Sequence, residues 1–342
     1  METIKYSIVI PIYNEEETFP ELIKRVSEVM DLLDGPAEAV LVDDGSKDSS
    51  YQLMVEAGLR DPRVKVMQLS RNFGHQVAIT AGMDASSGQA VIVMDADLQD
   101  PPHVILEMAA KWQEGYEVVQ AVRERRDGET LFKRTTATLF YKLLRRIAEI
   151  EQPVDVGDFR LVDRKALEAF LQLRESNRYV RGMFSWIGFR QIAVPYTRAP
   201  RHAGRSKYPL RKMLSFASNG IIGFSTAPLR LALAAGLVLA IASVGYGVVA
   251  IALKLAGLPD VPGYASLLVT ITFLSGVQLI MIGMVGQYVA RIYDEVRSRP
   301  LYLVREARGF TEHGGGNGRA VWPAAQDQPP ASAGHVPPGP AK

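Results

Sequence analysis

Three carboxylates follow an apolar run at residues 91–102, which read VIVMDADLQDPP. The apolar residues predict a buried strand, and Asp95, Asp97 and Asp100 come just after it. Alternate residues of an extended segment point the same way, so Asp95 and Asp97 can converge on one site. Their oxygens suit Mg²⁺ or Mn²⁺, hard cations that link carboxylates to phosphates. The alternative for the segment is an acidic turn before a helix that begins at Pro101, and in either case Asp100 is expected to cap this helix.

Polar and aromatic residues also follow two other predicted strands. Tyr13 and Glu15 come just after the strand 6–12, and Asp43 and Asp44 just after a strand that begins at residue 39. The carboxyl ends of parallel strands form one crevice, where a ring can stack on a base and carboxylates can hold ribose hydroxyls. Taken alone, the acidic pair and the Gly-Ser after it are equally typical of a turn with a helix cap.

The elements that must position these residues are strands alternating with helices. The expected strands are 6–12, 39–42, 64–69, 91–94, 117–121 and 189–196, and the expected helices are 16–33, 74–85, 102–114, 131–148 and 164–173. This alternation predicts a mostly parallel sheet covered on both faces. No G-x-G-x-x-G follows the first strand and no G-x-x-x-x-G-K-[ST] occurs, which disfavours a dinucleotide fold and a P-loop NTPase.

Three later segments each allow two interpretations. The arginines of residues 122–128 could clamp phosphates or could simply be solvated. Asp158 could cap locally, but the glycine before it suggests that the backbone approaches a ligand closely. Basic residues in 201–208 could satisfy a charge bias beside a membrane, yet the glycine and serine among them are typical of a phosphate-binding loop.

The histidines do not have the spacing of metal ligands. His75, His103 and His202 are therefore interpreted as ordinary helix or loop residues, with only His202 expected near phosphate. The chain has no cysteine, which excludes disulfides and Cys-ligated zinc. Its net charge of +2 is too small to suggest a nucleic-acid partner.

Two long uncharged runs in the last third of the chain predict transmembrane helices, at 231–253 and 263–290, with a buried soluble hairpin as the alternative. An amphipathic interfacial helix is expected in 209–230. Basic residues gather before the first run and after the second, whereas the loop 254–262 has one lysine and one aspartate. The positive-inside rule then makes this loop external and the N-terminal domain and both termini cytosolic.

The expected organisation of the chain follows from these segments. It consists of a cytosolic domain (1–208), a juxtamembrane helix (209–230), two spans (231–253 and 263–290) with a short loop (254–262) between them, a basic cytosolic segment (291–309) and a disordered tail (310–342). The N-terminus lacks the pattern of a signal peptide.

Together these motifs resemble the inverting family-two glycosyltransferases, and within them the polyisoprenyl-phosphate glycosyltransferases related to dolichol-phosphate mannose synthase and to bacterial prophage glucosyltransferases. The two-span C-terminus is most similar to the bacterial glucosyl branch. The resemblance runs in order from about residue 5 to about residue 308. The motifs that carry it are PIYNEEE (11–17), DDGSKD (43–48), SRNFGHQVAITAG (70–82), DADLQDPP (95–102), DVGDFRL (155–161) and RHAGRSKY (201–208).

The resemblance implies a GT-A type nucleotide-diphospho-sugar transferase fold, in which Asp158 matches the catalytic acidic position. It also implies that a mobile region over the donor includes Arg123 and Lys133, although Arg134 is an equally good match. The remaining implied roles are nucleoside binding by Pro11, Tyr13, Glu15, Val42, Asp44 and Asp95, binding of Mg²⁺ or Mn²⁺ by Asp95, Asp97 and Gln99, and phosphate or acceptor binding by Arg201, Ser206 and Lys207.

The implied reaction is transfer of a hexose, with glucose from UDP-glucose as the first choice, to undecaprenyl phosphate at the cytosolic face of the plasma membrane. GDP-mannose or a UDP-amino sugar are alternative donors, and a non-catalytic sugar-nucleotide-binding scaffold is an alternative of another class. A lipid phosphate is largely dianionic at pH 7, so we expect Asp158 chiefly to orient the acceptor or sugar. The partners are the donor, the lipid acceptor and the bilayer. Glycines in the second span would also permit a homo-oligomer.

Overall fold

The computed structural model describes residues 3–123, 156–176, 178–197, 227–256 and 263–310. The helix expected at 131–148, nearly all of the expected juxtamembrane helix and the tail lie outside these residues. The predicted site residues Lys133, Arg201, Ser206 and Lys207 lie outside them too.

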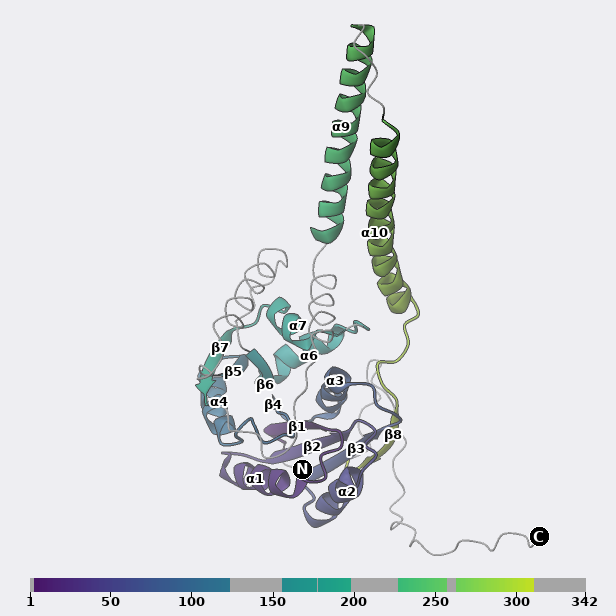
Figure 1. Cartoon of the computed structure of the whole chain (residues 1–342). Coiled ribbons are helices and arrows are strands. Elements are labelled where there is room, and N and C mark those ends of the chain that lie inside the picture. The colour runs from purple at the N-terminus through teal and green to yellow at the C-terminus, as the bar shows by residue number, and fades with distance from the viewer. Residues whose placement is uncertain (1–2, 124–155, 177, 198–226, 257–262, 311–342) are drawn as a thin grey trace, which may run out of the picture.

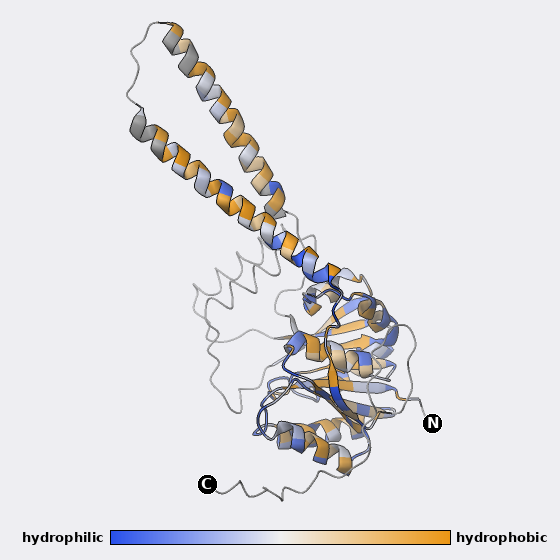
Figure 2. Cartoon of the chain, turned by 90° about the vertical axis from the view of Figure 1, so that its right-hand side faces the viewer, coloured by the Kyte–Doolittle hydropathy of each residue, from blue (hydrophilic) through white to orange (hydrophobic). Residues whose placement is uncertain are grey.

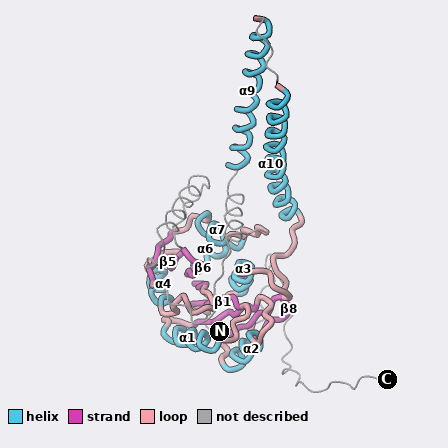
Figure 3. Tube along the Cα trace, viewed as in Figure 1, coloured by secondary structure: helices cyan, strands magenta, loops and turns pink. Residues whose placement is uncertain are grey.

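One mixed sheet of eight strands organises the described part of the N-terminal domain, in the order β7-β5-β6-β4-β1-β2-β3-β8 (Figures 1 and 3). Four of its seven pairings are parallel, which confirms the mostly parallel sheet. The strands are β1 (Tyr6–Ile12), β2 (Ala37–Asp43), β3 (Val64–Leu69), β4 (Ala90–Val93), β5 (Val118–Arg123), β6 (Val156–Asp163), β7 (Gln191–Tyr196) and β8 (Val304–Arg308). The sequence did not predict β6 or β8, and these two strands make all three antiparallel pairings.

Helices cover both faces of this sheet. One apolar cluster includes Ile8 and Ile10 of β1, and the other includes Val9, because alternate residues of a strand face opposite sides. The first cluster takes in residues of α1 (Phe19–Leu32), α2 (Ser50–Arg60) and α4 (Val104–Gln113), and the second takes in residues of α3 (His75–Ala85), α6 (Arg164–Gln172) and α7 (Val180–Trp186). The domain is therefore a three-layer α/β structure with two cores.

Antiparallel pairing of β6 with β4 brings the beginning of β6 beside the end of β4. In this register Val93, the last residue of β4, lies opposite Arg160. The residues just before Arg160 are thus level with the loop that follows β4. This places Asp158 at the same edge of the sheet as Asp95, although the two are far apart in sequence.

Two long helices, α9 (Ala227–Leu255) and α10 (Tyr264–Val296), extend away from the sheet domain as a hairpin (Figure 1). The windows Ala232–Val249 and Val269–Val296 are apolar enough to cross a membrane, and neither is buried within the protein. Figure 2 shows both helices as largely hydrophobic, with hydrophilic residues near the end of α10 that adjoins the sheet domain. These helices occupy the two predicted spans. Beyond α10 the chain returns to the sheet, where β8 pairs with β3.

Candidate active site

The loops that follow β1 and β2 are joined by side chain to backbone hydrogen bonds. The amide of Asn14 donates to Ser46 Oγ at 3.0 Å, and the Asn14 side-chain oxygen accepts from the amide of Lys47 at 2.8 Å. The amide of Glu15 donates to Ser50 Oγ at 2.8 Å. The polar residues of the DDGSKD segment and of the helix after it thus fix the loop that carries Tyr13.

A pocket of about 350 Å³ lies beside these loops, at the carboxyl ends of β1, β2 and β4. It is lined by Pro11, Ile12, Tyr13, Glu15, Asp44, Asn72, Gly74, His75, Ala78, Asp95, Ala96 and Asp97. The structure therefore brings together six of the residues expected to bind nucleotide or metal. Val42 does not join them, because its side chain is fully buried in the core on the α3 face of the sheet.

Asp44 is buried at the rim of this pocket and is bound to the beginning of α3. Its carboxylate accepts hydrogen bonds from the amides of Phe73 at 2.7 Å and Gly74 at 3.0 Å. Burial raises the pKa of Asp44, and these two amides offset part of the rise. Asp44 therefore fixes the position from which His75 projects.

The loop after β4 carries the residues predicted to hold a metal ion. Asp97 accepts a hydrogen bond from the amide of Gln99 at 3.1 Å, and Leu98 between them has a φ of 57°, which is rare for a residue with a branched side chain. The side-chain oxygen Oε1 of Gln99 is buried and has no hydrogen-bond partner in the described part of the chain. Such an oxygen, on the loop that also carries the carboxylates of Asp95 and Asp97, fits a hard cation such as Mg²⁺ or Mn²⁺.

These protein groups would not enclose an ion by themselves. Among the described residues no group of three or more His, Cys, Asp or Glu side chains is placed to hold a metal. An ion at this loop would need other oxygens, as expected for Mg²⁺, which keeps waters and substrate phosphates as ligands.

Asp100 does not cap α4, so the sequence interpretation of this residue was wrong. The helix begins at Val104, and His103 at its N-cap makes no side-chain cap. Asp100 is instead fully buried and accepts a hydrogen bond from the hydroxyl of Tyr196 on β7 at 2.5 Å. The hydrogen bond between Tyr196 and Asp100 therefore connects the loop after β4 to β7, an edge strand of the sheet.

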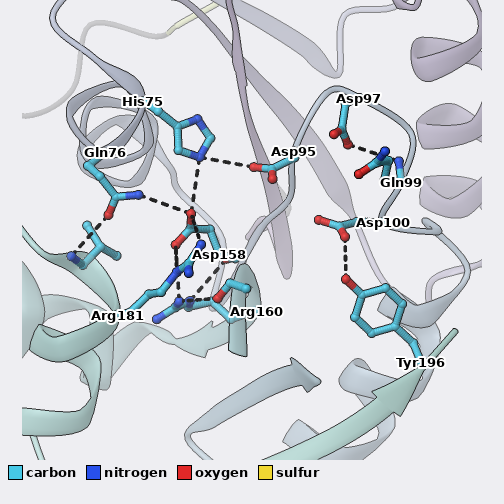
Figure 4. Close-up of polar contacts among 12 residues, drawn as sticks. His75, Gln76, Asp95, Asp97, Gln99, Asp100, Asp158, Arg160, Arg181 and Tyr196 are labelled. Atoms are coloured by element: carbon cyan, nitrogen blue, oxygen red, sulfur yellow. Dashed lines mark hydrogen bonds and ion pairs between the residues drawn. The ribbon is translucent and has the colours of Figure 1, made fainter. Parts of the chain in front are cut away.

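Asp158 lies within β6, among basic and amide side chains (Figure 4). Arg181 of α7 donates to both carboxylate oxygens, from Nε at 3.0 Å and from a terminal nitrogen at 3.1 Å. Gln76 Nε2 donates at 3.2 Å. A terminal nitrogen of Arg160, which is 1% exposed, lies 3.7 Å away. Local capping by Asp158 is excluded, because Asp163 caps α6.

His75 connects Asp158 to the loop after β4. Its Nε2 lies 3.2 Å from Asp95 Oδ1 and 3.5 Å from Asp158 Oδ2. Burial of the ring opposes its charge, but the two carboxylates outweigh burial and raise the pKa of His75 to about 10. The sequence did not predict His75 in the site, because the spacing of the histidines excludes only a metal role. Its position just after the loop that follows β3 was the available signal.

The basic groups also determine the charge of Asp158. Burial alone would raise the pKa of this carboxyl group, but His75, Arg181 and Arg160 hold the pKa well below its usual range. Asp158 is consequently ionised at neutral pH and its oxygens are hydrogen-bonded. A carboxylate in this state is a weak proton acceptor but is well placed to orient a neighbouring group.

The remaining predicted site residue within the described part is Arg123. It is the last residue of β5, and its backbone pairs in register with Tyr196 of β7.

Comparison with known proteins gives consistent matches. Residues 7–171 match the model of glycosyl transferase family 2, and residues 227–292 match that of the GtrB C-terminal hairpin. The uncharacterized glycosyltransferase YkcC of Bacillus subtilis (strain 168) is 50% identical, over 90% of this chain and 95% of its own. The SfII prophage-derived bactoprenol glucosyl transferase of Shigella flexneri is 43% identical, over 89% and 98%. A glucosyl-3-phosphoglycerate synthase structure from Mycobacterium tuberculosis is 19% identical with a TM-score of 0.42, over 64% and 78%.

Proposed function

The chain belongs to glycosyl transferase family 2, and from this premise we propose that it transfers a hexose, with inversion, from a nucleotide sugar to undecaprenyl phosphate. Glucose from UDP-glucose is the first choice of donor, because several relatives are named bactoprenol glucosyl transferase. The reaction takes place at the cytosolic face of the plasma membrane, next to the apolar hairpin.

One observation carries the proposal. The pocket lined by Tyr13, Asp95 and Asp97 adjoins the ion network of His75 and Asp158, in a domain continuous with the hairpin. The pocket suits a nucleotide, and the ion network suits transfer to an acceptor. The apolar hairpin suits an acceptor that is a lipid.

The pocket residues have distinct roles in donor binding. The ring of Tyr13, which is 42% exposed, stacks on the base, and Glu15 and Asp44 lie where ribose hydroxyls would bind. Asp95, Asp97 and Gln99 would hold Mg²⁺ or Mn²⁺ together with phosphate and water oxygens. When bound, the ion stabilises the negative charge that develops on the leaving diphosphate.

Asp158 orients the reacting groups and is not the main proton acceptor. A lipid monophosphate has a second pKa of about 6 and is largely dianionic at pH 7, so its oxygen can attack the sugar without a strong base. The new bond forms between this oxygen and the anomeric carbon as the bond to the diphosphate breaks. Arg181, Arg160 and protonated His75 offset the charge of Asp158, which lets a second anion approach.

The decisive experiment uses the full-length protein in membranes. It is supplied with undecaprenyl phosphate and, separately, with UDP-glucose, GDP-mannose and a UDP-amino sugar, each with and without EDTA. The mass of the extracted lipid identifies the sugar transferred. We expect a hexosyl-phosphoryl lipid from UDP-glucose that EDTA abolishes and that added Mg²⁺ or Mn²⁺ restores.

The other outcomes are equally informative. A product from another donor would keep the reaction and change the sugar. Binding of nucleotide sugar without any lipid-linked product would instead indicate the non-catalytic scaffold.

A further inference from the structure

A second set of polar contacts joins the end of α10 to the segment between α6 and α7. Both carboxylate oxygens of Glu295, in the last turn of α10, accept hydrogen bonds from Ser176. The Ser176 amide donates to one oxygen at 2.9 Å and its hydroxyl donates to the other at 3.0 Å. A single residue of the sheet domain thus occupies both acceptors at the end of the hairpin.

The contact between Ser176 and Glu295 lies close along the chain to Arg181, which binds Asp158. Helix α7 begins four residues after Ser176, at Val180, whose amide donates to Gln76 Oε1 at 3.2 Å. The next residue, Arg181, makes the two hydrogen bonds to Asp158, and Gln76 donates to the same carboxylate. A shift of α7 relative to the hairpin would therefore move a direct partner of Asp158.

Helix α3 is attached to the same region at its other end. Asp84, in the last turn of α3, accepts two hydrogen bonds from Arg174 at 2.8 Å each. It also accepts one from the hydroxyl of Tyr302 at 2.8 Å. Tyr302 is buried and lies between α10 and β8. The first turn of α3 carries His75 and Gln76, so α3 is anchored to Tyr302 just beyond α10, and the segment that leads into α7 is anchored to Glu295 at the end of α10.

We propose that Glu295 is a positioning residue for the transfer reaction, which acts through Ser176 and α7 on Arg181 and Asp158. The inference rests on the proposed function, in which the acceptor phosphate comes from the membrane that the hairpin crosses. The distance between the acceptor phosphate and Asp158 then depends on how the sheet domain is held against α10. Small misplacements of reacting groups cost large factors in rate, so the contact between Ser176 and Glu295 affects turnover more than donor binding.

The test compares Glu295→Gln with Asp294→Asn in full-length protein in membranes. Glu295→Gln keeps the shape of the side chain but removes its charge and replaces one acceptor oxygen with an NH2 group, which cannot accept a hydrogen bond from Ser176. Asp294 is an exposed neighbour on the same turn for which the described residues provide no hydrogen bond or ion pair, so its variant controls for the charge change. We expect kcat to fall about tenfold in Glu295→Gln, with the KM for nucleotide sugar unchanged, and to stay within about twofold in Asp294→Asn.

A double variant tests whether Ser176 transmits the effect. If it does, Ser176→Ala combined with Glu295→Gln lowers kcat little further than Glu295→Gln alone. Equal losses in Glu295→Gln and Asp294→Asn would overturn the proposal, as would an unchanged kcat in Glu295→Gln. A loss of folded protein with normal kcat per folded molecule would also overturn it, because it indicates a purely structural contact.

Amide hydrogen exchange gives a readout that needs no substrate. Exchange at Ser176 and along α7 should become faster in Glu295→Gln and stay at the wild-type rate in Asp294→Asn. Wild-type protein that forms no lipid product would refute the proposed function. Faster exchange in Glu295→Gln, but not in Asp294→Asn, would still support the coupling of Glu295 to α7 through Ser176. Unchanged exchange in Glu295→Gln would overturn it.

Discussion

Asp158 keeps its negative charge because the residues that pack around it are basic. The carboxylate is 5% exposed, and an isolated buried carboxylate would gain a proton instead of staying ionised. Arg181, His75 and Arg160 come from three different elements, so the ionised state depends on the assembled fold. The site therefore combines a permanent anion with one buried cation, Arg160, and two partly exposed ones, His75 and Arg181.

Replacement of Asp158 by Asn tests whether this residue is a general base. Because the pKa of Asp158 lies well below its usual range, the carboxylate does not titrate near neutral pH. We expect Asp158→Asn to lower kcat about 100-fold at every pH, through misorientation of the reactants. Both enzymes should lose rate below about pH 6, where the acceptor phosphate gains a proton. A pH–rate profile checks this, and recovery of the variant at high pH would indicate a lost base.

Replacement of Arg181 by Gln tests the ion pair itself. Removing one partner of a buried pair usually costs more than 3 kcal/mol, but Arg181 is 35% exposed and Arg160 and His75 remain, so we expect a loss of about 2 kcal/mol. Thermal unfolding in detergent across pH measures this loss. Arg181→Lys keeps the charge and should lose less.

The pH dependence of that loss has a defined sign. The folded-state pKa of Asp158 is lowered, so its contribution is complete above the unfolded pKa of about 3.9 and disappears as the pH falls through the folded pKa. The stabilities of wild type and Arg181→Gln should therefore converge in strongly acidic solution. A difference that grows toward low pH would contradict this assignment.

Residue spacing predicted part of the site and missed the rest. Asp95 and Asp97 are two residues apart, and Tyr13 and Asp44 each follow a strand, so local patterns place them in the pocket. Arg181 carries no such signal, since it lies in a short helix that reaches Asp158 only through the fold of the chain. Val42 was assigned by resemblance, and the alternation of side chains along β2 directs it into the core instead.

At the scale of elements, the turn after β2 depends on one glycine. Gly45 has a φ of +72°, and a Cβ atom there would lie 2.8 Å from the backbone of Arg71 and Asn72. We expect Gly45→Ala to cost about 1–3 kcal/mol of stability and to raise the KM for nucleotide sugar several-fold, since the turn holds the Tyr13 loop.

Gly35→Ala is the matched control for this turn. Its added Cβ would lie 2.7 Å from Cδ and 3.2 Å from Cβ of Lys5, so a side chain must shift there but no backbone atom is met. Thermal unfolding and the KM for nucleotide sugar should both stay close to wild type. Equal effects of the two substitutions would contradict a specific role for Gly45.

Local patterns predicted the elements whose own residues are regularly spaced or rich in β-branched side chains. β1 and β3 have the bounds that their β-branched runs predict, and α3 begins one residue after its expected start. β6 and β8 were missed because their sequences, VGDFRLVD and VREAR, alternate weakly and include several charges. Both strands exist through antiparallel pairing with other strands of the sheet, and such tertiary pairing leaves no signal in the local pattern of the strand itself.

At the scale of the whole molecule, the hairpin and the sheet domain are in contact at the end of α10. β8 adds an edge strand to the sheet after α10, and Glu295 and Tyr302 contact the segments around α3 and α7. The sheet domain is therefore joined to the hairpin by the chain that follows α10 as well as by the chain that precedes α9. The sequence predicted the spans from their apolar length, but it gave no sign of this return.

The orientation of the hairpin can be tested directly, because the chain contains no cysteine and single cysteines can be introduced. Positive charge on both flanks predicts that the loop 254–262 is external and the sheet domain cytosolic. In right-side-out vesicles, a membrane-impermeant maleimide should label Leu258→Cys. Leu59→Cys, at a position 75% exposed on α2, and Leu303→Cys, at one 57% exposed after α10, should react only once the membrane is permeabilised. Labelling of Leu59→Cys but not Leu258→Cys in sealed vesicles would place the active site outside the cell, where nucleotide sugars are absent, and would refute the orientation and the proposed cytosolic reaction together.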